Sequence, residues 1–529
     1  VKVNQSTVGT IDKGLLLLLG YENLDDIEDI NWVVKKTINM RIFQDADDKM
    51  NLSLKDINAE LLLVSQFTLH ASTKKGNRPS FIKAASGEYA NELYQKTIIE
   101  FNKQLNKKEG YLVVVLGWLA MIFTGTIPYI ITGTIDGFSN IMFETTSGFT
   151  TTGATILNDI EILPEGILFW RSITHWLGGM GMIVFAIAIL PLLGIGGMQL
   201  FNAESPGPST DKLHPRITDT AKRLWMIYLS YTVIETIFLQ LAGMSFFDAI
   251  NHSMSNIASG GFSTKNQSLG YWNDNPLVQY IVIFFMFLAG TNFVLSYFGF
   301  KFNFKKIIED DEFKIYSLFI VGFTTAIVLI LYLNPSLDSN ISGIEETFRH
   351  SLFQVVSIIT TTGFVTADYT AWSPLILLLF FGMMFLGGSA GSTSGGFKIM
   401  RHLLIIKNGV LQFKKILHPH AIIPLRYNKS SVSTEITHNI LGFFIVYMLS
   451  FMIGTIVFAL LGLDFESALG VSASSLGNVG PSIGSFGPMN TFFELPLLAK
   501  WWSSFLMLLG RLELFTVLIV FTPYFWSNR

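Results

Sequence analysis

Ser147-Gly-Phe-Thr-Thr-Thr-Gly153 is the first of four related stretches in this chain. The others are Ser255-Asn-Ile-Ala-Ser-Gly-Gly261, Ser357-Ile-Ile-Thr-Thr-Thr-Gly363 and Ser474-Ser-Leu-Gly-Asn-Val-Gly480. Each has a Ser six residues before its last glycine and a Phe fifteen residues before it, at positions 138, 246, 348 and 465. The glycines are 108, 102 and 117 residues apart, which indicates an internal repeat.

The composition from residue 109 onward is typical of a membrane protein. Only 14% of the whole chain is charged and 50% is hydrophobic, whereas a soluble domain carries about 25% charged residues. Residues 1–108 differ, with frequent Lys, Asp and Glu and no apolar run long enough to cross a bilayer. Cysteine is absent, which excludes disulfides and thiolate metal sites.

Eight segments are candidates for membrane spans, because a helix needs roughly 20 apolar residues to cross the hydrocarbon core. They are 111–131, 166–193, 224–243, 277–299, 315–333, 373–403, 438–461 and 497–523. The connections within 212–223, 301–314 and 398–429 hold fifteen Lys and Arg, and the opposite connections hold three. The positive-inside rule therefore predicts that the basic connections and both ends of this region are cytoplasmic.

Each repeat is predicted to contain a span, a half-span, a loop and a second span. The half-span between Phe and Ser is too short to cross, so we expect a helix that enters from outside and ends midway. Non-helical backbone at that depth must be buried in protein or line a water-filled cavity. Four such loops around one axis would bring together carbonyl oxygens that replace a cation's hydration shell. The partially negative C-terminal ends of the half-helices would also favour a cation.

Two other interpretations fit the same loops. They could be Gly- and Thr-rich packing motifs between transmembrane helices, which are common, or ordinary extracellular turns. Packing does not require two anchors at fixed offsets in four segments, and the loops are poor in charge. The pattern therefore favours a pore, with glycine used where a side chain would crowd the axis or where φ is positive.

Several stretches of residues 109–529 resemble the membrane subunit of bacterial Trk/Ktr potassium transporters. They are Thr145–Leu157, Trp176-Leu-Gly-Gly-Met-Gly-Met182, Gly196-Gly-Met-Gln-Leu200, Gly387–Lys398 and Gly510-Arg-Leu-Glu-Leu514. The resemblance covers about 420 residues and implies an all-α integral membrane protein. The implied fold has four M1–P–M2 pore repeats, with eight transmembrane helices and four re-entrant pore helices around one pore.

The resemblance also implies a potassium filter that binds K+ through backbone carbonyls. Its expected residues are Thr151, Thr152, Gly153, Ser259, Gly260, Gly261, Thr361, Thr362, Gly363, Asn478, Val479 and Gly480. In related plant transporters a Ser at the first glycine position goes with sodium transport. Glycine at all four positions favours potassium, and a sodium or unselective cation pathway of the same fold is the alternative.

The sixth candidate span is interrupted by five glycines in ten residues. These glycines, at positions Gly387, Gly388, Gly391, Gly395 and Gly396, cannot sustain a stable helix, since each costs about 1 kcal/mol relative to Ala. The stretch resembles the family's intramembrane loop, which obstructs the pore and moves during gating. A kink between packed helices is the alternative.

Arg511 lies in an apolar stretch, and a charge at that depth is a functional-site hypothesis by default. We expect it to line the pore beneath the filter and to raise the barrier to potassium until the gate moves. The alternative is a structural ion pair with Glu513 or with a group on another helix. Arg171 and His175 are expected to be interfacial or helix-packing groups.

The family resemblance implies partners and a location as well. It implies a homodimer in the bacterial plasma membrane, regulated by a cytoplasmic nucleotide-binding subunit (TrkA/KtrA-like) that docks on the basic loops. K+ is expected as the transported ion, with no bound organic cofactor, and the regulatory nucleotide, NAD or ATP, is expected on the partner.

Residues 1–104 resemble a D-aminoacyl-tRNA deacylase, a small α/β homodimeric enzyme. The matching stretches are Gly14–Gly20, Arg41-Ile-Phe43, Lys49-Met-Asn-Leu-Ser53, Ser65-Gln-Phe-Thr-Leu69 and Lys75-Gly-Asn-Arg-Pro-Ser-Phe81. In the family, Ser65, Gln66, Phe67 and Thr68 would line the site for the aminoacylated tRNA end, where hydroxyl and amide groups position an ester carbonyl. The segment lacks the family's first ten or so residues and its C-terminal Gly-Pro motif. We therefore expect a truncated, inactive α/β domain fused to the transporter, with tRNA a partner only if it is functional.

The predicted organisation follows from these boundaries. A partial deacylase-like domain occupies 1–104, with a junction at 105–110. The four pore repeats are expected at 111–200, 201–300, 301–425 and 426–529.

Overall fold

A computed structural model describes most of the chain. The residues outside the description are 1, 4–5, 8–10, 12–13, 45–48, 55–56, 58, 73–77, 106, 185–216, 335–342, 419–420, 422, 433 and 527–529. The chain divides into two compact units, one containing Val1–Val113 and Leu518–Arg529 and the other most of Val114–Val517. We refer to these as the N-terminal unit and the membrane unit.

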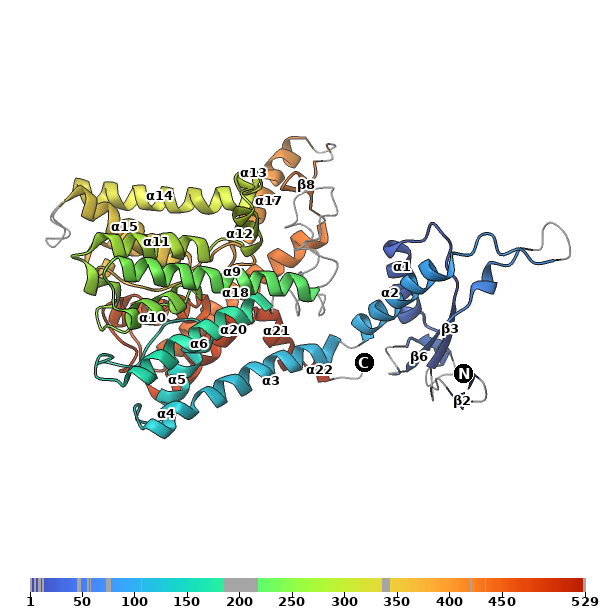
Figure 1. Cartoon of the computed structure of the whole chain (residues 1–529), viewed down its shortest axis with the longest axis horizontal. Helices are drawn as coiled ribbons and strands as arrows, with labels where there is room; N and C mark the ends of the chain where they lie inside the picture. Colours follow the sequence, from blue (N-terminus) through green and yellow to red (C-terminus); the bar gives the residue numbers. More distant parts are fainter. Residues whose placement is uncertain are drawn as a thin grey trace. The chain divides into compact units, whose positions relative to one another are not determined.

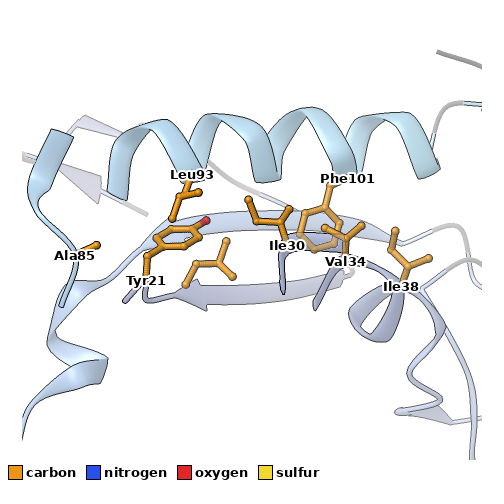
Figure 2. Close-up of a cluster of buried hydrophobic side chains, with 8 residues drawn as sticks. Tyr21, Ile30, Val34, Ile38, Ala85, Leu93 and Phe101 are labelled. Carbon is orange, nitrogen blue, oxygen red and sulfur yellow. The ribbon is translucent and has the colours of Figure 1, made fainter. Parts of the chain in front are cut away.

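The N-terminal unit is a small α/β structure. Strand β3 (Gly14–Leu19) pairs in parallel with β6 (Glu60–Ser65), and the short pairs β1 (Lys2–Val3) with β2 (Ser6–Thr7) and β4 (Phe43–Gln44) with β5 (Met50–Leu52) are antiparallel. Helices α1 (Ile27–Asn39) and α2 (Gly87–Leu105) bury one apolar face each. Their side chains meet those of the strands in one hydrophobic cluster (Figure 2). This small sheet is consistent with a truncated α/β domain.

The membrane unit is built from helices. Those with long apolar runs are α3 (Lys107–Gly125), α6 (Glu165–Val184), α9 (Ile217–Leu241), α11 (Pro276–Ala289), α14 (Asp311–Leu333), α17 (Ile399–Leu417), α18 (Thr434–Leu460) and α20 (Leu497–Arg511). The short connecting helices are α4 (Ile127–Thr132), α12 (Phe293–Phe300), α13 (Phe304–Glu309), α16 (Pro374–Met383) and α21 (Leu514–Leu518). In Figure 1 several of the long helices, such as α9 and α14, run along one common direction.

By length and composition, four described helices can cross a membrane, or six if each of two bent pairs counts as one span. The bent pairs are α11 with α12, at 112°, and α20 with the segment 514–521, at 116°. The predicted sixth span is broken, since α16 stops at Met383 and α17 starts only at Ile399. The second predicted span lies within the described residues only up to position 184, and Gly196–Leu200 lies outside them.

Four buried helices precede the four glycine stretches. They are α5 (Phe138–Phe149), α10 (Phe246–Ile257), α15 (Ile344–Ile359) and α19 (Phe465–Gly477). The recurring Phe is the first residue of α5, α10 and α19. It lies one turn inside α15, because that helix begins at Ile344. Apart from their first turn, these helices are almost entirely buried, as expected of segments surrounded by other helices.

Candidate functional site

All four buried helices end in the same hydrogen-bonded turn. The carbonyl of the recurring Ser accepts a hydrogen bond from the N–H five residues later. The N···O distances are 2.9 Å for Ser147–Thr152, 2.9 Å for Ser255–Gly260, 2.8 Å for Ser357–Thr362 and 3.0 Å for Ser474–Val479. This is the Schellman arrangement, which needs a residue with positive φ just past the helix.

That left-handed residue is never glycine here. It is Thr151, Ser259, Thr361 and Asn478, with φ between 52° and 55°. Non-glycine residues in this region are strained and persist only where their surroundings hold them. At Ser259, Thr361 and Asn478 the polar side chain forms hydrogen bonds to neighbouring segments, which accounts for a polar residue at these three positions.

In two repeats the hydroxyl of the recurring Ser also forms a hydrogen bond to the backbone of the following loop. The hydroxyl of Ser357 donates to the carbonyl of Phe364 at 2.7 Å, and that of Ser474 donates to the carbonyl of Gly480 at 2.8 Å. Ser255 instead contacts Nδ1 of His175 at 2.9 Å. The hydroxyl therefore fixes the loop backbone next to the glycine or secures the helix to its neighbour.

The structure brings the four glycine loops together in a closed cycle, which we call the glycine ring (Gly153, Gly261, Gly363 and Gly480). A Cβ added to any one of them would overlap a carbonyl oxygen of the next loop. The carbonyls met in turn belong to Gly260, Thr362, Val479 and, closing the cycle, Thr152. All four glycines have φ between 79° and 97°. Glycine is thus required twice, by backbone conformation and by the approach of the neighbouring loop.

A buried ion pair lies behind the first two loops. Nε of Arg171 on α6 is 2.9 Å from Oε1 of Glu144 on α5, and both side chains are almost fully buried. Glu144 also accepts from the hydroxyl of Thr155 and the N–H of Ile156, each at 3.0 Å. Nη1 of Arg171 donates to the carbonyl of Ser263 at 3.1 Å. The pair therefore joins the loop after Gly153 to the loop after Gly261.

The position of Glu144, nine residues before the ring glycine, is occupied in the next two repeats by His252 and Gln354. Nε2 of His252 contacts the hydroxyl of Ser263 at 2.9 Å, and Nε2 of Gln354 donates to the carbonyl of Ala367 at 3.2 Å. The fourth repeat has Val471 there. Three of the four loops are thus bonded back to their own helix through one equivalent position.

The glycine-rich interruption, residues 387–396, forms an ordered turn that we call the glycine loop. Its ends are joined by hydrogen bonds from Gly387 N to Phe397 O at 3.0 Å and from Ile399 N to Gly388 O at 3.3 Å. Gly391 and Gly396 have φ of 72° and 69°. A Cβ on Gly387 or Gly388 would collide with Gly395 or Ser394 within the same loop.

The glycine loop contacts the helix ends below the ring. The N–H of Gly395 donates to the hydroxyl of Thr361 at 2.6 Å, and the hydroxyls of Thr393 and Ser259 lie 3.0 Å apart. Two of the strained left-handed residues therefore bind the loop directly. This explains why those positions carry hydroxyl groups.

Arg511 ends helix α20 and is buried against the glycine loop. Its Nη1 donates to the carbonyl of Thr393 at 2.8 Å and its Nη2 to the carbonyl of Gly178 on α6 at 3.1 Å. Among the described residues it forms no ion pair, and Glu513 is paired with Arg401 instead. The alternative of an Arg511–Glu513 pair is therefore wrong. A small cavity beside the loop is lined by Ser394, Lys398 and Tyr447 as well as Arg511 and Glu513.

Of the two roles expected for Arg171 and His175, the interfacial one is wrong, because both side chains are almost completely buried. The helix-packing role is confirmed, because Arg171 contacts α5 and His175 contacts α10. Arg171 supports the loops as described, and the His175 ring stacks on Phe262 with centroids 4.0 Å apart. The sequence signal was a lone acid, Glu144, on one apolar segment and a lone base, Arg171, on the next. Two isolated opposite charges in adjacent buried segments favour pairing.

The predicted enzyme site lies at the end of β6. Ser65 is its last residue, Gln66 follows, and Phe67 and Thr68 begin the short helix η1 (Phe67–His70). Nε2 of Gln66 donates to the hydroxyl of Thr68, and the rings of Phe67 and Phe81 meet edge-on at 5.3 Å. Residues 75–77 of the matching downstream stretch lie outside the described residues.

Two family sequence models match the chain. One is described as "Cation transport protein" (TrkH) and matches residues 88–527. The other is described as "D-Tyr-tRNA(Tyr) deacylase" and matches residues 1–117. The two matches overlap at residues 88–117, and together they cover nearly the whole chain.

Curated relatives and a solved structure match the membrane unit. The Trk system potassium uptake protein TrkH of Halomonas elongata is 40% identical over 429 residues, covering 80% of this chain and 87% of the relative. TrkH of Escherichia coli (strain K12) is 40% identical over 430 residues with the same coverage. The crystal structure of the potassium transporter TrkH from Vibrio parahaemolyticus superposes with a TM-score of 0.72 at 35% identity, covering 84% of this chain and 92% of that one.

Proposed function

The chain belongs to the TrkH family of cation transport proteins, and we propose that it takes up potassium through the glycine ring. The observation that carries this proposal is the cycle in which each ring glycine approaches a carbonyl of the next loop. Four carbonyls held at one level by rigid helix ends could replace the water around a dehydrated cation. Among the described residues, no group of three His, Asp or Glu is placed to hold a metal ion, so backbone oxygens are the better candidates.

The helix ends add to the attraction. α5, α10, α15 and α19 all finish just before the ring, so their partially negative C-terminal ends point toward the same place. The side chains between the helix ends and the ring glycines are uncharged, and most of them are hydroxyls. This environment favours a cation while leaving it mobile.

We assign gating to the glycine loop and Arg511. The loop lies against Ser259 and Thr361 below the ring, and Arg511 places a buried positive charge on the carbonyl of Thr393. A cation would meet both an obstruction and a like charge on this path. Opening of the ion path then requires the glycine loop and Arg511 to move apart.

The partner proposals follow the charge distribution. The basic connections 301–314 and 398–429 lie on one side in the proposed topology, where a cytoplasmic nucleotide-binding subunit (TrkA/KtrA-like) could dock. A homodimer, a plasma-membrane location and cytoplasmic ends belong to the same proposal.

Rubidium uptake tests the proposed function. The chain, expressed in a bacterial host without its own potassium uptake systems, should support growth at low potassium and accumulate 86Rb+. Gly153→Ser should reduce total uptake, because its Cβ would overlap the carbonyl of Gly260, and the uptake that remains should admit more sodium relative to rubidium. Absence of uptake with normal membrane expression would contradict the proposal, and equal sodium and rubidium uptake by the parent chain would favour an unselective pathway.

A second candidate function concerns the N-terminal unit only. The match of residues 1–117 to the deacylase family and the bonded Gln66–Thr68 pair favour a relic of a tRNA ester site. Purified chain should be incubated with D-Tyr-tRNA and the release of D-tyrosine followed. We expect no hydrolysis above the spontaneous rate, and turnover abolished by Thr68→Val would establish the enzyme instead.

A further inference from the structure

We propose that the first turn of α14, Asp310–Glu312, couples a cytoplasmic hairpin to the glycine loop, with Glu312 as the residue that keeps the loop in place. The hairpin consists of β7 (Arg426–Tyr427) and β8 (Ser430–Ser431). The inference rests on the proposed function, because it explains how a docked partner reaches the gate. It concerns a positioning residue outside the ring, and none of the sequence motifs contains it.

Glu312 ties the glycine loop to the first turn of α17. Its Oε1 accepts hydrogen bonds from Ala390 N at 2.8 Å and from Met400 N at 3.1 Å. The first amide lies within the loop and the second in the first turn of α17. The Glu312 side chain is almost completely buried. Losing the carboxylate would leave two buried N–H groups without this acceptor, which strongly disfavours the present loop position.

The same helical turn is bonded to the hairpin through Asn428. Nδ2 of Asn428 donates to Oδ2 of Asp310 at 2.7 Å, and Oδ1 of Asn428 accepts from Asp311 N at 2.8 Å. The backbone N–H of Asn428 donates to Oδ2 of Asp311 at 3.3 Å, and Lys407 pairs with the same oxygen at 2.8 Å. The hairpin is thus held to the helix end through both the side chain and the backbone of one residue.

Asp310 makes the turn a rigid connector. Its Oδ1 caps α14 by accepting from Phe313 N at 2.8 Å, while its Oδ2 binds the hairpin. A capped first turn moves as one body with the residues that follow it. A displacement of Asn428 is therefore passed to Glu312, two positions further along the same turn.

The turn of the hairpin is accessible to a partner protein, whereas the Glu312 side chain, which we call the clamp, is not. Lys429 has an 85% exposed side chain at the hairpin turn, and Arg426 is exposed as well, whereas Asn428 and Glu312 are buried. Lys429 lies 3.8 Å from Oε2 of Glu309, and this exposed pair is one that an acidic partner would compete with. A docking protein with an acidic surface would bind Lys429 and Arg426 and pull on Asn428 from outside. The bistable element that this pull biases is the glycine loop.

Hydrogen–deuterium exchange on the purified full chain tests the clamp directly. Peptides covering residues 387–400 should exchange about tenfold faster or more in Glu312→Ala, because a buried hydrogen bond to a charged group is lost at two amides. Glu312→Gln keeps an acceptor oxygen and should restore most of the protection. Glu165→Gln, at an exposed carboxylate in the first turn of α6, is the control and should change nothing. Equal exchange in Glu312→Ala and the parent would overturn the clamp.

The coupling has its own test. The chain has no cysteine, so Lys429→Cys can be labelled alone with a maleimide-polyethylene glycol that mimics a bulky partner. The label should speed exchange at 387–400, and adding Asn428→Ala should abolish that effect. Lys305→Cys, at an 83% exposed site, is the control label. A label effect that persists in Asn428→Ala would overturn the coupling.

Measuring 86Rb+ uptake in parallel distinguishes a failure of the clamp from a failure of the proposed conduction. Proteoliposomes of Glu312→Ala should take up 86Rb+ faster than those of the parent chain. Faster exchange at 387–400 without uptake in any variant would contradict the proposed conduction while the clamp stands. Uptake by the parent with unchanged exchange in Glu312→Ala would contradict the clamp alone.

Discussion

The glycine ring and the glycine loop are both rich in glycine, but different groups hold them in place. In the ring, a Cβ would meet a backbone carbonyl of the adjacent loop at all four positions, and the four φ values agree within 18°, from 79° to 97°. In the glycine loop, Gly391 faces the side chain of Asn292, and side chains of Thr361, Glu312 and Arg511 hold the loop in addition to two backbone hydrogen bonds, from Ser389 N to Gly290 O and from Phe293 N to Gly391 O.

This difference shows how glycine can contribute to a rigid structure in one region and to a movable one in another. Backbone against backbone leaves no rotamer to change, so we expect the ring to keep one geometry. Side chains from several helices can each release a loop, so we expect a second arrangement of the glycine loop, as the proposed gating requires. The predictions below test the contrast, starting with the largest expected effect.

Gly363→Ala should abolish rubidium uptake. Its Cβ would overlap the carbonyl of Val479 and lie 2.8 Å from Cδ of Pro481, and φ of 80° is unfavourable for alanine by about 1–2 kcal/mol. Uptake of 86Rb+ normalised to membrane expression measures the effect. Gly409→Ala on α17 is the control, because nothing lies within 4 Å of its added Cβ. Normal uptake by Gly363→Ala would show that the glycine ring can accommodate the added methyl group.

Arg171→Met should destabilise the membrane unit by about 3–5 kcal/mol, because it leaves Glu144 buried without its partner. Thermal unfolding of the purified chain in detergent would report the loss. The double variant Glu144→Gln with Arg171→Met should recover much of it, since no isolated charge remains. If the double variant is as unstable as the single one, packing by the Arg171 side chain and not charge supports the ring.

The repeat pattern predicted the ring residues because each repeat carries the same signals at the same offsets. The Ser carbonyl, the left-handed residue and the glycine are all local to one turn, and local geometry is visible in a sequence. The membership of the chain in a potassium-transporter family was likewise evident from the stretches around Gly153 and Gly387.

The side chains that hold the glycine ring and the glycine loop in place could not be predicted in the same way. Glu312 follows Glu309, Asp310 and Asp311, an acidic run typical of a solvated helix start. Its acceptance of the amides of Ala390 and Met400 depends on contacts between residues 78 and 88 positions apart in the sequence. The role of Arg171 was left open between interfacial and helix-packing for the same reason, because its partners come from two other elements. The tertiary contact, not the local pattern, defines these roles.

Arg511→Ala should raise rubidium uptake several-fold in the parent background. The change removes a buried positive charge and the hydrogen bonds to the carbonyls of Thr393 and Gly178. Both effects lower the barrier below the ring. Initial rates of 86Rb+ entry into proteoliposomes measure it, and Arg511→Lys, which keeps the charge but loses the forked donor geometry, should fall between the two. Unchanged uptake with reduced expression would make Arg511 structural.

Gly322→Ala should produce the smallest effect and serves as a control outside the glycine ring and the glycine loop. Gly322 lies inside α14 with an ordinary helical φ, and nothing lies within 4 Å of an added Cβ. Alanine should therefore stabilise the helix by about 0.5–1 kcal/mol and leave uptake unchanged. Thermal unfolding and 86Rb+ uptake on the same preparation are the measurements. Impaired uptake here would mean that sensitivity to Gly→Ala is general in the membrane unit, so the losses expected at Gly363 could not be assigned to the ring's closed cycle of carbonyls.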